Sequence, residues 1–353
     1  MASERVMGRF KMMVLRRRAL GVLACGCLFL SGGEIQAQDF YAGKTISIIV
    51  SGGGLYENYA RVFARTMPKY IPGRPTMIVK QLTGGGGIRA GNFIHNIAPK
   101  DGTVIAGTHG AVLSAALLSP DVVDFDVTKF GWIGNATHDT YLAYVWYTAP
   151  IQTFEQARTT EVIMGGSSVG SAGIDYAIFA RNLLGYKIRI VSGYKSSPET
   201  KFAMEKGEIH GTMGNAFSSL NSTDWLATGK VRVLLQHGSK PHRAFPTVPL
   251  FRDLAQDEGQ RRMLELMGIR EEISKPYFAP PGVPAERLAI LRRAFEASLK
   301  DPEFLAEAQR QQFEIEDPMT GDQLAAIATR VASTPPAVVQ QLVGLFKNYK
   351  DAR

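Results

Sequence analysis

The chain has very little cysteine. Its 353 residues include two, Cys25 and Cys27, and both lie within the first 37 residues. Because we interpret residues 1–37 as a segment that is removed on export, the mature chain would have no disulfide, no thiolate metal site and no cysteine nucleophile. The six histidines are scattered, and His237 and His242 lack the i, i+4 spacing that would place both on one helix face. We therefore expect neither a metal nor a cofactor.

A long apolar run is also absent. The apolar stretch over residues 19–30 follows the basic residues 16–18 and is too short for a membrane-spanning helix, which needs about 20 residues. A basic segment followed by a short apolar run is typical of a secretory signal peptide. We expect residues 1–37 to be that peptide, cleaved after Ala37, and the mature protein to be periplasmic. Lipid modification at Cys25 is an alternative that the sequence leaves open.

The excess of positive charge is small. The whole chain has 40 Lys and Arg against 32 Asp and Glu, a net charge of +8, and without residues 1–37 it has 34 against 30, or +4. Nucleic-acid recognition requires a concentrated basic footprint, which this balance does not supply. With 45% apolar and 20% charged residues the composition is that of a globular protein. At this length two lobes are expected rather than a single core.

Short apolar runs alternate with amphipathic stretches, the pattern of βαβ units and a largely parallel sheet. We predict strands over residues 46–50, 77–79, 103–106, 162–164 and 188–191, each followed by a loop of small or polar residues and then a helix. These units form two similar sets. We therefore predict an α/β protein with lobe 1 over residues 38–141 and 248–353, and lobe 2 over residues 142–247.

The loops after the predicted strands are rich in glycine. Consecutive glycines at a strand-to-helix turn let backbone N–H groups converge, and the helix N-terminus adds its positive dipole end, so an anion is favoured there. In an open α/β sheet, ligands bind beyond the carboxyl ends of the strands. A flexible turn is the simpler reading of any one loop, but loops in both halves favour a shared anion site. The candidate residues are Ser51, Gly52, Gly53, Gly54, Tyr56, Thr83, Gly84, Gly85, Gly86, Thr108, His109, Ser167, Ser168, Gly170 and Tyr194.

A serine hydrolase is the main rival interpretation. Residues 166–170 match the nucleophile-elbow pattern G-x-S-x-G, with Ser168 as nucleophile. Asp224 and then His237 or His242 follow in the order of an α/β-hydrolase triad. The simpler reading is that Ser168 lies in a helix-capping segment. In addition, no His-Gly-Gly-Gly segment, which supplies the oxyanion hole in such hydrolases, precedes Ser168. A dinucleotide-binding pattern around residues 85–90 is weaker still, because no acidic residue follows at the required distance.

Several segments together resemble the tripartite tricarboxylate transporter receptor family, the Bug or TctC-like extracytoplasmic solute-binding proteins. They are residues 41–46, 53–61, 70–76, 86–92, 98–103, 129–134, 205–211, 279–287 and 300–304. The resemblance implies a type II periplasmic-binding-protein-like fold, with two α/β lobes and a ligand cleft between them. It also implies a monomer that binds a small organic anion, a carboxylate, and delivers it to integral membrane subunits of a transporter without chemical change. A ligand-sensing receptor on the same fold remains an alternative.

The resemblance also implies where the ligand is held. The family's ligand loops fall on residues 51–57 and 81–87, and its contacts from the other lobe on residues 166–170 and 194–196, which adds Glu57, Gln81 and Ser196 to the candidates. The family usually has Asp where this chain has Glu57, and Asn-x-Pro-Gly-Ala-Gly-Gly where this chain has residues 81–87. From the residues alone, Glu57 has three readings: it pairs with a ligand ammonium, pairs with Arg61, or stabilises the helix dipole.

Overall fold

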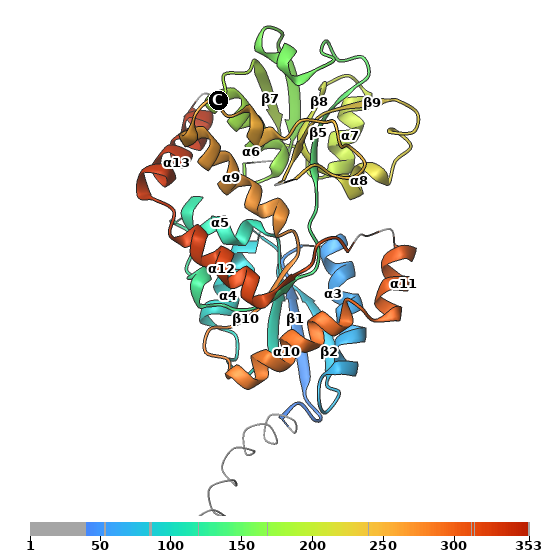
Figure 1. The fold of residues 1–353 in the computed structure, drawn as a ribbon, viewed down its shortest axis with the longest axis vertical. Helices are drawn as coiled ribbons and strands as arrows, with labels where there is room; N and C mark the ends of the chain where they lie inside the picture. Colours follow the sequence, from blue (N-terminus) through green and yellow to red (C-terminus); the bar gives the residue numbers. More distant parts are fainter. Residues whose placement is uncertain are drawn as a thin grey trace, which may run out of the picture.

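The computed structural model describes residues 40–52, 54–84, 87–118, 120–167, 169–238, 240–311, 313 and 315–351. The expected signal peptide, with Cys25 and Cys27, lies outside these residues. The chain forms two lobes, one above the other in Figure 1, and each is built around its own β-sheet. The α/β class predicted from the sequence is confirmed. Among the described residues, no helix combines the length and the apolar character that crossing a bilayer would require.

The sheet of the first lobe has six strands in the order β11-β4-β10-β3-β1-β2. Strands β1, β2 and β3 are parallel, whereas β10 is antiparallel to β3 and β4, and β11 is antiparallel to β4. Every residue of β1 after Thr45 is buried, as expected for an apolar strand covered on both faces. The strands are β1 (Thr45–Val50), β2 (Thr76–Gln81), β3 (Val104–Gly107), β4 (Gly131–Asn135), β10 (Pro276–Ala279) and β11 (Met319–Thr320).

The sheet of the second lobe has five strands in the order β7-β6-β8-β5-β9. Strand β6 pairs in parallel with β7 and β8, and β5 is antiparallel to β8 and β9. The strands are β5 (Tyr141–Trp146), β6 (Val162–Gly166), β7 (Ile188–Ser192), β8 (Gly211–Ala216) and β9 (Val231–His237). The sequence did not predict β5 and β10, the reversed strands that carry the chain from one lobe into the other.

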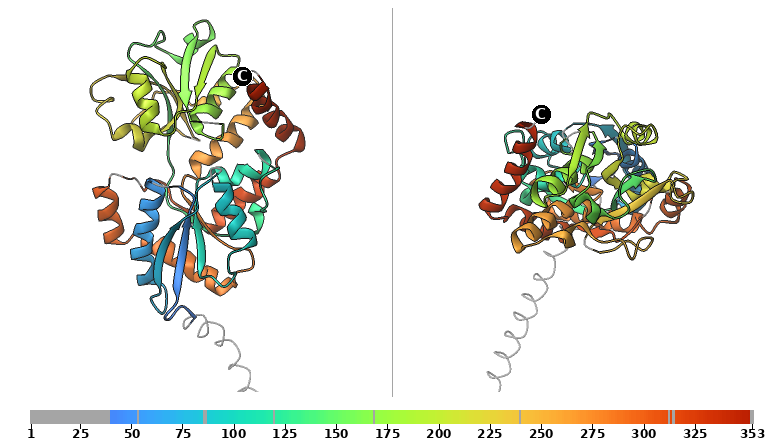
Figure 2. Two further views of the ribbon diagram at one scale, coloured as in Figure 1. Left: turned by 180° about the vertical axis from the view of Figure 1, so that it is seen from behind. Right: turned by 90° about the horizontal axis from the view of Figure 1, so that it is seen from above.

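Helices surround both sheets. In the first lobe these are α3 (Leu55–Thr66), α4 (Ile88–Asn96), α5 (Ala111–Leu118), α10 (Ala285–Ser298), α11 (Pro302–Arg310) and α12 (Gly321–Ala332). Beside the second sheet lie α6 (Ala172–Ile178), α7 (Ser197–Glu205) and α8 (Phe217–Asn221), whereas α9 (Glu258–Glu272) contacts α5. The last helix, α13 (Pro336–Asp351), contacts α5 as well as α6 and α9, and in Figure 2 it runs along one side of the molecule beside both lobes. Residues after 247 therefore pack on both lobes, and the division that we drew at 248 stays a prediction.

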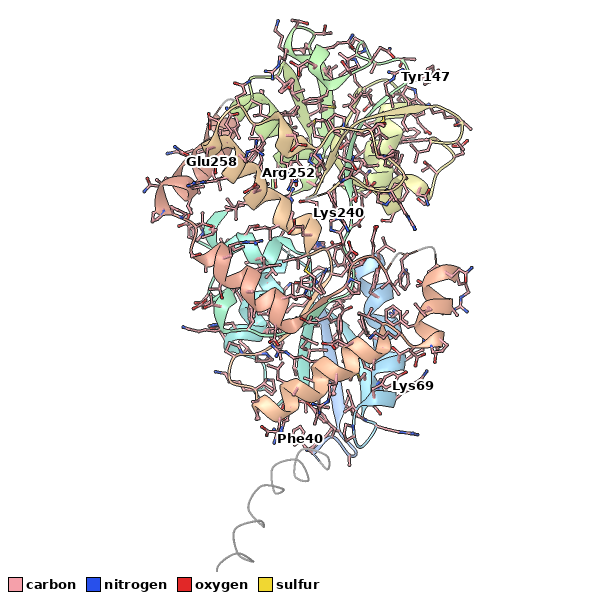
Figure 3. The ribbon with its side chains drawn as sticks, in the orientation of Figure 1. Phe40, Lys69, Tyr147, Lys240, Arg252 and Glu258 are labelled. Carbon is pink, nitrogen blue, oxygen red and sulfur yellow. The ribbon has the colours of Figure 1, made fainter. Side chains whose placement is uncertain are left out.

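Three segments run side by side where the lobes join. The Ala136 amide donates to the Lys275 carbonyl at 3.1 Å, the Asp139 amide to the Glu271 carbonyl at 3.2 Å, and the His138 amide to the Glu316 carbonyl at 2.7 Å. Lys240, on the side of the second lobe that faces the first in Figure 3, also forms an ion pair with Asp317. Because these bonds satisfy the backbone of the crossing segments, the connection between the lobes is ordered rather than a loose linker.

Candidate functional site

The direction of the strands decides where the loops lie. Gly107, at the end of β3, pairs with Tyr277 at the start of β10, and Asn135, at the end of β4, pairs with Pro276. In the second sheet, Tyr141 at the start of β5 pairs with the last residues of β8 and β9. Since β5 and β10 begin where the chain enters each lobe, the strands that run opposite to them end at the edges that face the other lobe, whereas β11, which is antiparallel to β4, runs in the same direction as β10. The predicted ligand loops follow those ends.

In the first lobe the structure brings the loops after β1, β2 and β3 together. The buried Ser51 hydroxyl accepts a hydrogen bond from the His109 amide at 3.3 Å. A Cβ atom on Gly52 would lie 2.7 Å from His109 Nε2, and one on Gly87 would lie 3.5 Å from the Thr108 Cβ. The Thr108 hydroxyl donates to the His109 carbonyl. Residues of three separate loops, among them the candidates Ser51, Gly52 and Thr108, therefore lie side by side.

Tyr56 and His109 form the wall of this surface. Their rings stack with centroids 3.8 Å apart and an interplanar angle of 7°. The ammonium group of Lys275, whose side chain is 4% exposed, lies 4.4 Å from the centroid of the Tyr56 ring. This contact has the geometry of a cation–π interaction. The sequence singled out Tyr56 and His109 but gave no reason to include Lys275.

Glu57 is bound by neighbours in the same lobe. One carboxylate oxygen accepts from Arg61 and the other from the Gln81 side-chain amide at 2.5 Å. These bonds hold the pKa of Glu57 below its ordinary value, the Arg61 bond most strongly. Of the three readings of Glu57, the structure contains the pairing with Arg61 and the position in the first turn of α3 that stabilises the helix dipole. The Gln81 bond also ties the end of β2 to the start of α3.

Two helix starts in the first lobe have no side-chain cap. Helix α3 begins after Gly54 and α4 begins after Gly87, and a glycine has no side chain that could accept a backbone N–H at the helix start. The first N–H groups of a helix have no partner within the helix and need one from outside. Both glycines have positive φ, 61° and 105°, which a residue with a Cβ rarely adopts. Thr83 and Gly84 lie exposed just before α4. These amides are suited to an anion.

The loops of the second lobe are satisfied internally to a greater degree. The Gly170 amide donates to Asp175 at 2.8 Å, and the Ser167 carbonyl accepts from the Gly193 amide at 2.7 Å. Ser196 is the N-cap of α7, since its hydroxyl accepts from the Glu199 amide. A Cβ on Gly165 would approach the Tyr194 ring to 3.1 Å, so Tyr194 packs on the end of β6. Ser196 in particular has a structural role that explains it without a ligand.

A buried charged network links the second lobe to the segment that crosses between lobes. Arg270, near the end of α9, donates from Nη1 to Asp175 at 2.8 Å and from Nε to Glu271 at 3.1 Å. Tyr176 donates to the other oxygen of Glu271 at 2.6 Å. The side chains of Arg270, Asp175 and Glu271 are 10%, 3% and 0% exposed. Asp175 also accepts a hydrogen bond from the Gly170 amide. Arg270 is therefore connected through Asp175 to a predicted ligand loop.

The first-lobe wall and this network lie close together. A Cβ on Gly110, the residue after His109, would be 2.7 Å from the Arg270 carbonyl oxygen. Burial, together with the positive charges of Lys275 and Arg270, lowers the pKa of His109 to about 4. Burial likewise raises the pKa of Tyr141 well above its ordinary value, and the Tyr56 hydroxyl is among the neighbours that contribute. We call Tyr56, His109, Tyr141, Arg270 and Lys275 the interlobe cluster.

Burial changes the protonation of two groups at this position. It raises the pKa of Glu271 to about 7, although the nearby Arg270 charge acts in the opposite direction. His109 is neutral at pH 7, so its ring can donate or accept a hydrogen bond without carrying a charge. The positive charge of the interlobe cluster therefore comes from Arg270 and Lys275. Sequence reasoning missed both, because each is a single basic residue outside any motif.

The proposed hydrolase triad is not assembled by the described members. Asp224 pairs with Lys230 at 3.0 Å rather than with a histidine. The Nε2 atom of His237 contacts the Met213 carbonyl, and its ring stacks on Tyr176 with centroids 3.6 Å apart. His242 accepts from the Ala244 amide. Neither histidine is oriented by Asp224, as a triad base would have to be.

Some predicted positions fall outside the described residues: Gly53, Gly85, Gly86 and Ser168. Within the part of the chain that is described, no three His, Cys, Asp or Glu residues gather as a metal site would require. A cavity of about 490 Å³ lies away from the predicted loops, beside α9. Its lining includes Tyr176, Arg252 and Arg330 and none of the candidate residues.

No family profile matches the chain, and no curated protein matches it. Solved structures do. A TctC solute-binding protein from Polaromonas is 18% identical, with a TM-score of 0.66 over 87% of this chain and 99% of that one. MatC from Rhodopseudomonas palustris, solved with bound malate, is 17% identical, with a TM-score of 0.60 over 86% of this chain and 98% of that one. A further R. palustris protein, solved with adipate, is 16% identical, with a TM-score of 0.61 over 86% and 97%. At these identities the likeness establishes the fold, and the chain has the two-lobed α/β fold of the TctC-type solute-binding proteins.

Proposed function

We propose that this chain is an exported solute-binding protein that captures a small carboxylate-type organic anion between its lobes and delivers it unchanged to a tripartite tricarboxylate-type transporter. The observation that carries the proposal is topological. The strands that run opposite to β5 and β10 end, together with the glycine loops that follow them, at the edges where the lobes face each other. Ligands of open α/β sheets bind at such ends.

The chemistry of that position favours an anion. The helices α3 and α4 begin without a side-chain cap, so their first N–H groups are available to negatively charged oxygens. Arg270 and Lys275 add positive charge. Proteins of the same fold have been solved with malate and with adipate. On this basis we propose that the protein is periplasmic and monomeric and that residues 1–37 are its signal peptide. We propose integral membrane subunits as its partners.

Ligand binding also explains the two-lobed arrangement. An anion that contacts both lobes binds the closed form more tightly than the open form, and therefore shifts the population towards closure. The crossing segments stay hydrogen bonded to each other, so the lobes can change their angle while the connection between them is preserved. A transporter can then distinguish the loaded from the empty protein by shape.

The test is a thermal-unfolding screen of the mature chain with malate, succinate, adipate, citrate and benzoate. A ligand that binds only the folded state stabilises it by RT ln(1 + [L]/Kd), about 2.7 kcal/mol at a hundredfold excess over Kd. We expect at least one of these carboxylates to raise the midpoint, and mass spectrometry of the purified protein to identify a co-purified carboxylate. If no member raises the midpoint and no organic anion co-purifies, the proposal fails.

A further inference from the structure

Two buried nitrogen atoms of the interlobe cluster lack partners. Within the described part of the chain, neither Arg270 Nη2 nor His109 Nε2 makes a hydrogen bond, and both are inaccessible to solvent. A buried donor without a partner costs about 1–3 kcal/mol, and more when the group is charged. Native proteins rarely retain such groups unless something else satisfies them. The residue after His109 packs against the Arg270 backbone, and the Arg270 charge acts on the His109 ring, so the two residues are neighbours and one guest could satisfy both nitrogens.

One edge of the Arg270 guanidinium has no acceptor among the described residues. Nη1 is taken by Asp175 and Nε by Glu271, and these bonds fix the plane of the group. The remaining edge carries Nη2. A guanidinium held by two carboxylates at other edges is preorganised, so little side-chain entropy is lost when a further acceptor binds.

The position of His109 is also fixed by its neighbours. Its ring stacks on Tyr56, its amide donates to Ser51, and the following residue packs on the Arg270 backbone. A neutral imidazole with hydrogen on Nε2 is a donor. The Lys275 ammonium group lies 4.4 Å from the centroid of the Tyr56 ring and 3.8 Å from the Asp139 carboxylate, and it supplies a second positive charge near this donor.

Resting on the function proposed above, we propose that Arg270 Nη2 and His109 Nε2, with Lys275 beside them, form a side-chain subsite for one carboxylate group of the ligand. The glycine loops and uncapped helix starts then hold the rest of the guest. This assigns the main charge recognition to side chains from three separate elements rather than to backbone amides alone. It also makes Arg270 a specificity-determining residue, because a charge-assisted hydrogen bond is about twice as strong as a neutral one.

The acidic neighbours Asp175 and Glu271 reduce the attraction of Arg270 for an anion. One of them provides the control variant. Asp175 holds the Gly170 loop, so its loss would disturb the second lobe as well. Among the described residues the Glu271 side chain bonds to Arg270 and Tyr176, and replacing it by Gln removes negative charge while keeping the shape of the side chain. Glu271→Gln is therefore expected to bind the ligand as tightly as the wild type or up to about tenfold more tightly.

The experiment measures, by calorimetry, the affinity of the tightest carboxylate of the screen and of its monoamide, in which one carboxylate is an uncharged amide. We expect Arg270→Gln to weaken binding of the carboxylate by about 10- to 100-fold. We also expect this variant to lose most of the preference of the wild type for carboxylate over monoamide. A residue that only positions the Gly170 loop would weaken both ligands alike and leave their ratio unchanged.

A second variant keeps the proposal testable if Arg270→Gln does not fold. His109→Phe keeps the ring that stacks on Tyr56 but removes Nε2, and it is expected to lower carboxylate affinity by about tenfold. The inference is overturned if folded Arg270→Gln and His109→Phe keep the wild-type ratio of carboxylate to monoamide affinity. That result would leave the proposed function intact, whereas a wild-type protein that binds no carboxylate would remove the function first and the subsite with it.

Discussion

The loops of the two lobes differ in how their polar groups are satisfied. In the first lobe, α3 and α4 begin without side-chain caps and three loops meet around the Tyr56–His109 pair. In the second lobe, α7 is capped by Ser196, and the Gly170 amide is held by Asp175. Both lobes have similar glycine-rich sequences at these positions. From this difference we expect the first lobe to present more of the recognition surface than the second.

The largest difference between the lobes in the loss of unfolding free energy is expected from substitutions of two glycines, Gly110 in the first lobe and Gly193 in the second. A Cβ on Gly110 would lie 1.8 Å from the Ile273 carbonyl oxygen, whereas a Cβ on Gly193 has nothing within 4 Å. We expect Gly110→Ala to cost about 3 kcal/mol or more, since backbone must move. Gly193→Ala is expected to cost about 1 kcal/mol, because φ there is +120°. Urea unfolding of both variants measures the difference, and equal costs would contradict the close packing of the first-lobe loop on the crossing segment.

The link between the lobes is expected to depend on pH through Glu271. Burial raises its pKa to about 7, so between pH 5 and 8 the folded state binds more protons than the unfolded state. Its stabilising contribution is present at low pH and is lost as pH rises through 7. Glu271→Gln cannot lose a proton, so relative to the wild type it is expected to gain stability on the order of 2 kcal/mol from pH 5 to pH 8.

The measurement is the difference in unfolding free energy between the two proteins at each pH. Taking this difference removes the contributions of groups that both proteins share, such as His109 and His237, whose pKa values burial lowers to about 4 and about 3. A difference that does not change between pH 5 and 8 would show that Glu271 is ionised throughout.

Gly52 tests recognition on the first lobe. Adding a methyl group there would bring it within 2.7 Å of His109 Nε2 and would push the ring out of its stack with Tyr56. We expect Gly52→Ala to weaken carboxylate binding by about tenfold, roughly 1.4 kcal/mol, with a smaller change in unfolding free energy. Calorimetric titration and urea unfolding provide the two numbers. A loss of stability with unchanged affinity would assign this loop a purely structural role.

Ser196 provides the matching test on the second lobe. Its hydroxyl caps α7, and removal of an N-cap costs about 1 kcal/mol. We expect Ser196→Ala to lower stability by that amount and to leave carboxylate affinity within about twofold of the wild type. A tenfold loss of affinity would restore Ser196 to the ligand contacts that the family resemblance implied, and would weaken the contrast between the lobes.

Much of the first-lobe site could be predicted from the sequence because its signals are local. The apolar run of residues 46–50 and the glycines after it specify strand, loop and helix within one stretch of chain, and Tyr56 and His109 lie within or next to such loops. Ser196 is ambiguous for the same reason. A serine in a strand-to-helix loop can contact a ligand or cap the helix, and both roles have the same local sequence pattern. In this chain the Ser196 hydroxyl accepts a hydrogen bond from the Glu199 amide, which only the structure reveals.

By itself, then, the sequence determined the α/β class, the alternation of strand and helix, and the glycine loops, since each follows from the spacing of apolar residues and from backbone freedom within a few positions. Only the tertiary structure decided which charged side chains meet those loops. Arg270 reaches Asp175 across 95 positions of sequence, and Lys275 reaches Tyr56 because β10 returns from the other lobe. Such contacts are fixed by how the chain crosses between its two sheets, and no local pattern records that crossing.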